Sequence, residues 1–114
     1  MSTTPGPDDA TVEKCLHLGH GFHEDERSRV VESIGKIDRH LVGRPADSVR
    51  IDLQVKDRDT PQQKVTMEAH VPGLPAVVGT ADDADVWSAV AHTRDEVTRQ
   101  LEDLKEKRLP NHRS

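Results

Sequence analysis

The chain has 114 residues, of which 32% are apolar, and Phe22 and Trp87 are its only aromatic residues. This supply is enough for one domain with one modest core built from Val, Leu, Ile and Ala, and a sheet covered on one face suits it. The formal net charge is -5. This charge argues against a general nucleic-acid binder, because affinity for phosphates depends on clustered Lys and Arg.

The expected compartment is the cytoplasm. A single cysteine, Cys15, excludes an internal disulfide and fits a reducing environment. The first residues have neither the basic end nor the apolar run of a secretory signal. No segment approaches the roughly 20 consecutive apolar residues that a membrane span needs. The sequence therefore predicts a soluble cytoplasmic protein with no membrane partner.

The first third of the chain is predicted to form a tail, a strand and a helix. Residues 1–10 are expected to be a disordered tail that can be removed without loss of stability. The strand follows, because Val12, Leu16 and Leu18 alternate with polar positions. Acidic residues 24–26 then begin a helix that Gly43 is placed to end, with Pro45 just beyond. The expected buried stripe of this helix is Val30, Ile34, Ile37 and Leu41.

The clearest strands lie in the middle of the chain. Apolar and polar residues alternate over 49–56 and again over 64–71, as in strands with one buried face. Residues 57–62 provide a hairpin loop between them, and the pair 72–73 provides the next turn. A short last strand is expected over 74–80.

The final segment predicts a long amphipathic helix. At about 100° per residue, positions 86, 89, 90, 93, 97, 101 and 104 fall on one side. Three acids, Asp82, Asp83 and Asp85, sit where a helix N-terminus favours acceptors and negative charge. The basic residues Lys105, Lys107 and Arg108 complement the other end of the helix dipole.

The predicted order is therefore βαβββα. It defines an α+β fold, a two-layer sandwich with two helices packed on one face of a four-stranded sheet. Its predicted core is Val49, Ile51, Leu53, Val65, Met67, Ile34, Ile37, Val90, Val97 and Leu101. Trp87 falls just off the apolar stripe and is expected to cover the edge of this core.

A pattern in the last third of the chain resembles a known family. Gly79 is followed by the acidic cluster, then Trp87, Ala89 and an aliphatic residue, and finally Arg-Gln-Leu-x-x-Leu-Lys-x-Lys over residues 99–107. This segment is similar to the closing helix of the ribosome hibernation-promoting factors, the small ribosome-associated inhibitor proteins. The resemblance extends topologically over residues 12–107 and implies the same fold. It assigns 11–108 to one such domain and 109–114 to a flexible basic tail, and it favours the short type without a dimerisation domain.

The resemblance implies a function in translation regulation and the stress response. Family members lodge in the decoding channel of the small ribosomal subunit, and basic residues on both helices face its ribosomal RNA. Such a protein would inhibit or stabilise idle ribosomes by steric occlusion, with no DNA partner, cofactor or catalysis. At about 100° per residue, Arg29, Lys36 and His40 project together, opposite the apolar stripe. The implied RNA-binding residues are Arg29, Lys36, Arg39, His40, Arg99, Lys105, Lys107 and Arg108.

A second hypothesis is a regulatory protein-interaction domain that has the same fold but has lost RNA binding. Glu96 and Asp103 stand where the family commonly has bases. They flank Arg99 at i−3 and i+4, a spacing typical of ordinary ion pairs on a helix surface. A charged outer face of this kind needs no ligand.

The remaining candidates are a metal site and an active site. Cys15, His17, His20 and His23 are four potential ligands, and a weaker third hypothesis makes them a metal or pH sensor. Their spacing is not that of the usual zinc pairs, so we expect no bound metal. The sequence also contains no phosphate-binding glycine loop, nucleophile elbow or H-E-x-x-H pair. We therefore predict a protein that is not an enzyme.

Overall fold

The computed structural model describes residues 12–41 and 48–108, with residues 107 and 108 described by their backbone only. The predicted tails, 1–10 and 109–114, and the predicted helix end at Gly43 and Pro45 lie outside these residues. The elements in chain order are β1 (Leu16–Leu18), η1 (Glu24–Glu26), α2 (Arg27–Ile34), η2 (Gly35–His40), β2 (Arg50–Lys56), β3 (Lys64–His70), β4 (Val77–Ala81) and α3 (Val86–Arg108), where η marks a 3₁₀ helix. This order confirms the predicted βαβββα arrangement.

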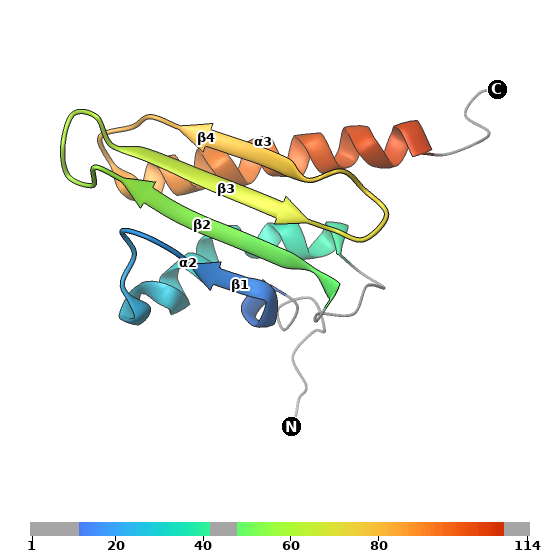
Figure 1. The fold of residues 1–114 in the computed structure, drawn as a ribbon, viewed down its shortest axis with the longest axis horizontal. Helices are drawn as coiled ribbons and strands as arrows, with labels where there is room; N and C mark the ends of the chain where they lie inside the picture. The colour runs from blue at the N-terminus through green and yellow to red at the C-terminus, as the bar shows by residue number, and fades with distance from the viewer. Residues whose placement is uncertain (1–11, 42–47, 109–114) are drawn as a thin grey trace.

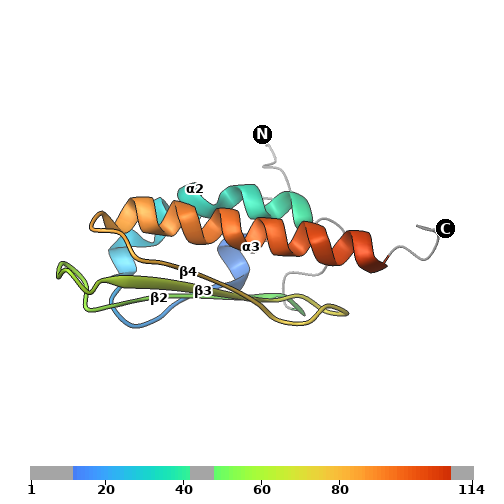
Figure 2. The same cartoon turned by 90° about the horizontal axis from the view of Figure 1, so that it is seen from above.

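The elements form two layers. The sheet has the order β1-β2-β3-β4, with β1 parallel to β2 and the other neighbours antiparallel. In Figure 1 the sheet lies in front of the helices, and in Figure 2 both helices lie on one side of it while the other side is bare. The predicted α+β class is confirmed. No helix in the described part of the chain is long and apolar enough to cross a membrane.

The core lies between the sheet and the helices. The register places Ile51 opposite Ala69 and Leu53 opposite Met67, so the inward side chains of β2 and β3 meet in one layer. Every residue of the predicted core is buried, including Ile34 and Ile37 from the first helical segment and Leu101 from α3. The predicted facing of both strands is therefore confirmed.

The first strand is shorter than predicted. Residues 12–15 are helical, and only Leu16–Leu18 form β1. The Val12 N–H donates to Asp38 Oδ1 over 2.9 Å, which satisfies a backbone donor at the start of this turn. Because side chains at i and i+3 share a helical face, Val12 and Cys15 both point into the core. The prediction of a strand from Val12 to Leu18 is therefore wrong for residues 12–15, which are helical.

The first helix also differs from its prediction, because it changes geometry after Ile34. Gly35 weakens the α-helix, and the chain continues as the 3₁₀ helix η2 to His40. A 3₁₀ helix turns by about 120° per residue, so side chains at i and i+3 eclipse one another. Ile34, Ile37 and His40 consequently point inward together.

The long helix α3 begins after the predicted acidic cluster. Asp85 Oδ2 accepts hydrogen bonds from the Ser88 N–H at 3.2 Å and the Ser88 Oγ at 2.8 Å, which caps the helix. Gly79 lets the helix approach β4 closely, since a Cβ there would lie 2.9 Å from the Thr93 carbonyl oxygen. Strand β4 begins at Val77 rather than at the predicted residue 74, because residues 72–74 complete the turn after β3.

Candidate nucleic-acid interface

Two of the predicted basic residues share the outer side of η2. Lys36 and Arg39 are three residues apart, so the 3₁₀ geometry points them in the same direction, and both are exposed. Together with α3 they line a cavity of about 130 Å³. Its lining residues are Lys36, Arg39, Arg94, Asp95 and Thr98. The structure thus brings basic side chains of both helices to one hollow.

The third basic residue of this cavity, Arg94, was not among the RNA-binding residues predicted from the sequence. Its Nη1 donates to the Ser33 carbonyl oxygen over 2.9 Å, and its guanidinium pairs with Asp95 at 2.9 Å. With 17% of its side chain exposed, Arg94 joins α3 to α2 and still faces the hollow. The available signal was a basic residue beside Thr93, at the border of the apolar stripe.

His40 does not project with Arg29 and Lys36, as the helical periodicity predicted, but is 6% exposed. The 3₁₀ turn from Lys36 adds about 80° to the rotation expected of an α-helix over four residues. Burial lowers the pKa of the imidazole, and the positive charges of Lys105 and Arg39 lower it further, against an opposing effect of Glu102. His40 therefore lies beneath the basic surface.

Arg29 is exposed, but its guanidinium packs against an aromatic ring. Its guanidinium carbon lies 4.2 Å from the centroid of Trp87, a cation–π contact between α2 and the start of α3. Trp87 is half-buried at the edge of the core, as predicted, and its ring lies 6.3 Å from that of Phe22. Arg29 stabilises the packing of the two helices through this contact.

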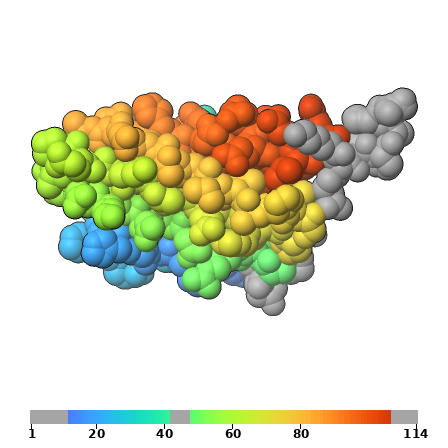
Figure 3. Space-filling model, turned by 45° about the horizontal axis from the view of Figure 1, so that its top comes forward, coloured from blue at the N-terminus to red at the C-terminus, as the bar shows by residue number. Residues whose placement is uncertain are grey.

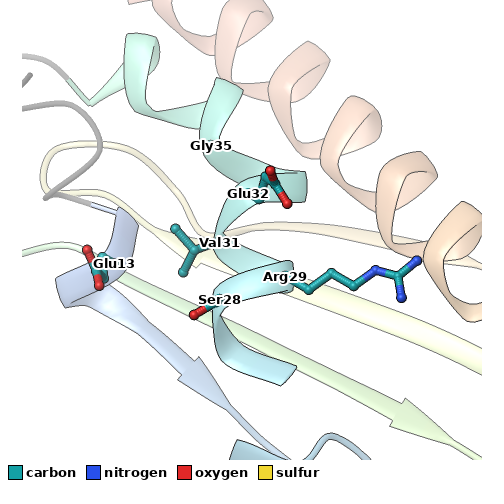
Figure 4. A pocket seen from close by; sticks show the side chains of 6 residues that line it. All are labelled: Glu13, Ser28, Arg29, Val31, Glu32 and Gly35. Atoms are coloured by element: carbon teal, nitrogen blue, oxygen red, sulfur yellow. The ribbon is translucent and has the colours of Figure 1, made fainter. Parts of the chain in front are cut away.

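A broader hollow lies along α2. It measures about 810 Å³. Figure 4 shows that Arg29 extends from α2 toward α3, whereas Glu13 lies on the helical turn before β1. The lining residues are Glu13, Ser28, Arg29, Val31, Glu32 and Gly35. With two carboxylates beside one guanidinium, this hollow is a poorer phosphate site than the cavity at η2.

The predicted basic residues of α3 are less available. Arg99 pairs with Glu96 at i−3 and with Asp103 at i+4, where the Nη1–Oδ2 distance is 3.7 Å, which confirms the predicted surface ion pairs. Lys105 is half-buried and close enough to His40 to affect its pKa. Only the backbone of Lys107 and Arg108 is described.

The predicted cysteine and histidine group does not come together. Cys15 is buried, and burial raises the pKa of its thiol to about 11. His17, His20 and His23 are exposed, and among the described side chains these four form no group of three with donor atoms within 4.8 Å of one another. In a strand Cys15 and His17 would share one face, but Cys15 lies in the helical turn before β1.

The structure is that of a small α+β domain with a local basic surface on its helical layer. The sequence profile of the Sigma 54 modulation protein / S30EA ribosomal protein family matches residues 22–109. The chain therefore belongs to this family of ribosome-associated, non-catalytic proteins.

Two solved structures have the same fold. The N-terminal domain of Protein Y from Thermus thermophilus is 18% identical with a TM-score of 0.60, over 77% of this chain and 92% of that chain. A ribosomal subunit interface protein from Coxiella burnetii is 14% identical with a TM-score of 0.53, over 79% of this chain and 96% of that chain. The comparison with curated proteins finds no match.

Proposed function

We propose that this protein binds the small ribosomal subunit in the cytoplasm and inhibits or stabilises idle ribosomes by steric occlusion. The outer surfaces of η2 and α3 would face ribosomal RNA. The observation that supports this most directly is the pairing of Lys36 and Arg39 on one side of η2, beside Arg94 of α3. Family membership and the name of the Coxiella burnetii relative, a ribosomal subunit interface protein, support the partner.

The proposed mechanism is local phosphate binding on an acidic protein. Basic side chains that neutralise phosphates release condensed counterions, which gives affinity even where the net charge is -5. Arg94 is held by the Ser33 carbonyl, so its orientation is fixed before binding. Lys36 and Arg39 are free to extend toward the RNA backbone, where ammonium and guanidinium groups both serve as phosphate ligands.

Co-sedimentation with purified small and large subunits over a salt series tests this proposal. The double variant Lys36→Glu/Arg39→Glu should lose most of its binding to the small subunit, and the remaining binding should depend less steeply on salt. The matched control is Lys56→Glu/Lys64→Glu. These two lysines are opposite one another in the β2–β3 register and exposed on the bare face of the sheet.

Both double variants change the net charge by the same amount, so the comparison separates a local interface from general charge. Equal losses in the two would show that binding follows net charge alone and would contradict the proposed surface. Retention by the large subunit rather than the small one would contradict the proposed partner.

The second candidate function is the protein-interaction domain, and the ion pairs of Arg99 favour it. Glu96 and Asp103 neutralise the guanidinium that would otherwise extend the basic surface along α3. A partner that recognises these two carboxylates would be a protein, because carboxylates repel the phosphates of a nucleic acid. Binding to a protein partner would depend on Glu96 and Asp103 and not on Lys36.

A further inference from the structure

The bare face of the sheet brings together three side chains from two neighbouring strands. Asp52 on β2 lies directly opposite Glu68 on β3, and His70 follows two residues later on the same face. One donor atom from each of the three lies within 4.8 Å of the others, the only such group among the described residues. Two carboxylates and an imidazole on neighbouring strands are a set of donors that metal sites use.

We propose that Asp52, Glu68 and His70 bind one divalent transition-metal ion of the Zn²⁺ type. Zinc takes imidazole nitrogen together with carboxylate oxygen, and a site with three protein ligands leaves the fourth position to water. The ladder of backbone hydrogen bonds between β2 and β3 fixes the three Cα positions, so only side-chain rotamers need to adjust. All three side chains reach solvent, since none is buried.

The charges around the three ligands favour a cation. Asp52 and Glu68 are like charges in a directly opposed cross-strand pair, which destabilises a sheet unless a positive charge offsets it. Arg50 supplies one, with Nε 3.1 Å from Asp52 Oδ1 and 3.0 Å from Oδ2. Its side chain is 59% exposed, so the guanidinium can swing away when a metal ion takes its place on Asp52.

The site is separate from the proposed RNA surface. Asp52, Glu68 and His70 occupy the side of the sheet that Figure 2 shows uncovered, whereas Lys36 and Arg39 lie on the helical layer. Metal binding and ribosome binding can therefore be tested independently, and the failure of one leaves the other standing.

Calorimetric titration of the untagged protein with Zn²⁺ tests the proposal. One ion should bind per chain, and His70→Gln or Glu68→Gln should weaken that binding by at least about tenfold, because each removes a ligand. The matched control is His92→Gln, since His92 is an exposed histidine with one nearby carboxylate, Asp83 at 3.8 Å, and should have no effect.

Two further results distinguish this site from adventitious binding by surface histidines. Arg50→Gln removes the cation that competes for Asp52 and should tighten Zn²⁺ binding rather than weaken it. Mn²⁺ added to the isotope-labelled protein should broaden the amide resonances of β2 and β3 around Asp52 and Glu68. Unchanged affinity in His70→Gln and Glu68→Gln, or broadening centred on His20 and His23, would overturn the proposal.

Discussion

Glu26 and Arg58 form a bidentate ion pair that joins the start of the first helix to the β2–β3 hairpin loop. Arg58 Nη1 lies 2.8 Å from Glu26 Oε1 and Nη2 lies 2.8 Å from Oε2. Nη1 also donates to the Gly21 carbonyl oxygen over 3.0 Å, and Glu26 Oε1 accepts from the His23 N–H. The two partners are 32 residues apart in sequence. This one contact therefore fixes the positions of two loops and the start of a helix relative to one another.

Removing this pair should destabilise the protein. Arg58→Ala should lower the free energy of unfolding by about 1–3 kcal/mol, because it deletes charge-assisted hydrogen bonds to a partly buried carboxylate. Chemical denaturation measures the change. The matched control is Arg50→Ala in metal-free buffer, which removes a more exposed arginine–carboxylate pair and should change stability much less than Arg58→Ala does. Equal effects of the two variants would contradict a special role for Arg58.

The same pair predicts a loss of stability in acid. Hydrogen bonding by Arg58 lowers the pKa of Glu26 from 4.5 to about 2. The folded-state pKa lies below the unfolded value, so this contribution is complete above pH 4.5 and disappears as the pH falls toward 2. Arg58→Ala should therefore show a smaller decrease in stability over this range than the unchanged protein, which denaturation at a series of pH values can measure.

His40 should reduce stability at mildly acidic pH. Burial and the nearby charges of Lys105 and Arg39 lower its pKa below 6.5, against an opposing effect of Glu102, and its Nε2 has no hydrogen-bond partner among the described residues. Below pH 6.5 the unfolded chain therefore protonates His40 more readily than the folded protein does. The free energy of unfolding is unaffected by His40 above pH 6.5 and decreases as the pH falls through 6.5 toward the folded-state pKa.

The test for His40 is the variant His40→Leu, which removes the titrating group while filling a similar volume. It should lose less stability than the unchanged protein between about pH 7.5 and about pH 5.5. The exposed His92→Gln serves as control and should behave like the unchanged protein. An unaltered pH dependence in His40→Leu would show that another group is responsible.

Gly79 should not tolerate a side chain. In Gly79→Ala the new Cβ would lie 2.9 Å from the Thr93 carbonyl oxygen and 3.2 Å from Glu96 Cβ. The helix must shift, at a cost of about 1–3 kcal/mol in the free energy of unfolding. Gly35→Ala is the matched control, since no described residue outside its own helix backbone and chain neighbours lies within 4 Å of its Cβ position, and there alanine should leave stability unchanged or raise it by up to about 1 kcal/mol. Thermal denaturation of both variants decides between these outcomes.

Replacing the acids beside Arg99 should strengthen ribosome binding. Glu96→Lys/Asp103→Lys releases Arg99 from its two ion pairs and adds two bases to the exposed stripe of α3. Co-sedimentation should then persist to higher salt than for the unchanged protein, because more counterions are released on binding. If ribosomes fail to retain either protein at low salt, the protein-interaction hypothesis takes the place of the ribosomal one.

The sequence by itself determined the elements that depend on the pattern of neighbouring residues. Alternation fixed the facing of β2 and β3, because successive side chains in a strand point to opposite faces. The 3.6-residue period fixed the buried stripe of α3, and the acids before it marked its start. The predicted RNA-binding residues Lys36 and Arg39 also point outward, as they must opposite the apolar stripe, although the periodicity that placed them misplaced His40.

Only the tertiary structure decided the rest, because the deciding contacts join distant parts of the chain. The hydrogen bond from Val12 to Asp38 belongs to a helical turn where the alternation indicated a strand. The change to 3₁₀ geometry after Gly35, which rotates His40 inward, is stabilised by burial against the core. The strand register and loop packing set the two remaining associations, that of Asp52 with Glu68 and His70 and that of Glu26 with Arg58. The residue pattern within a single helix or strand cannot predict these associations, because each joins different elements.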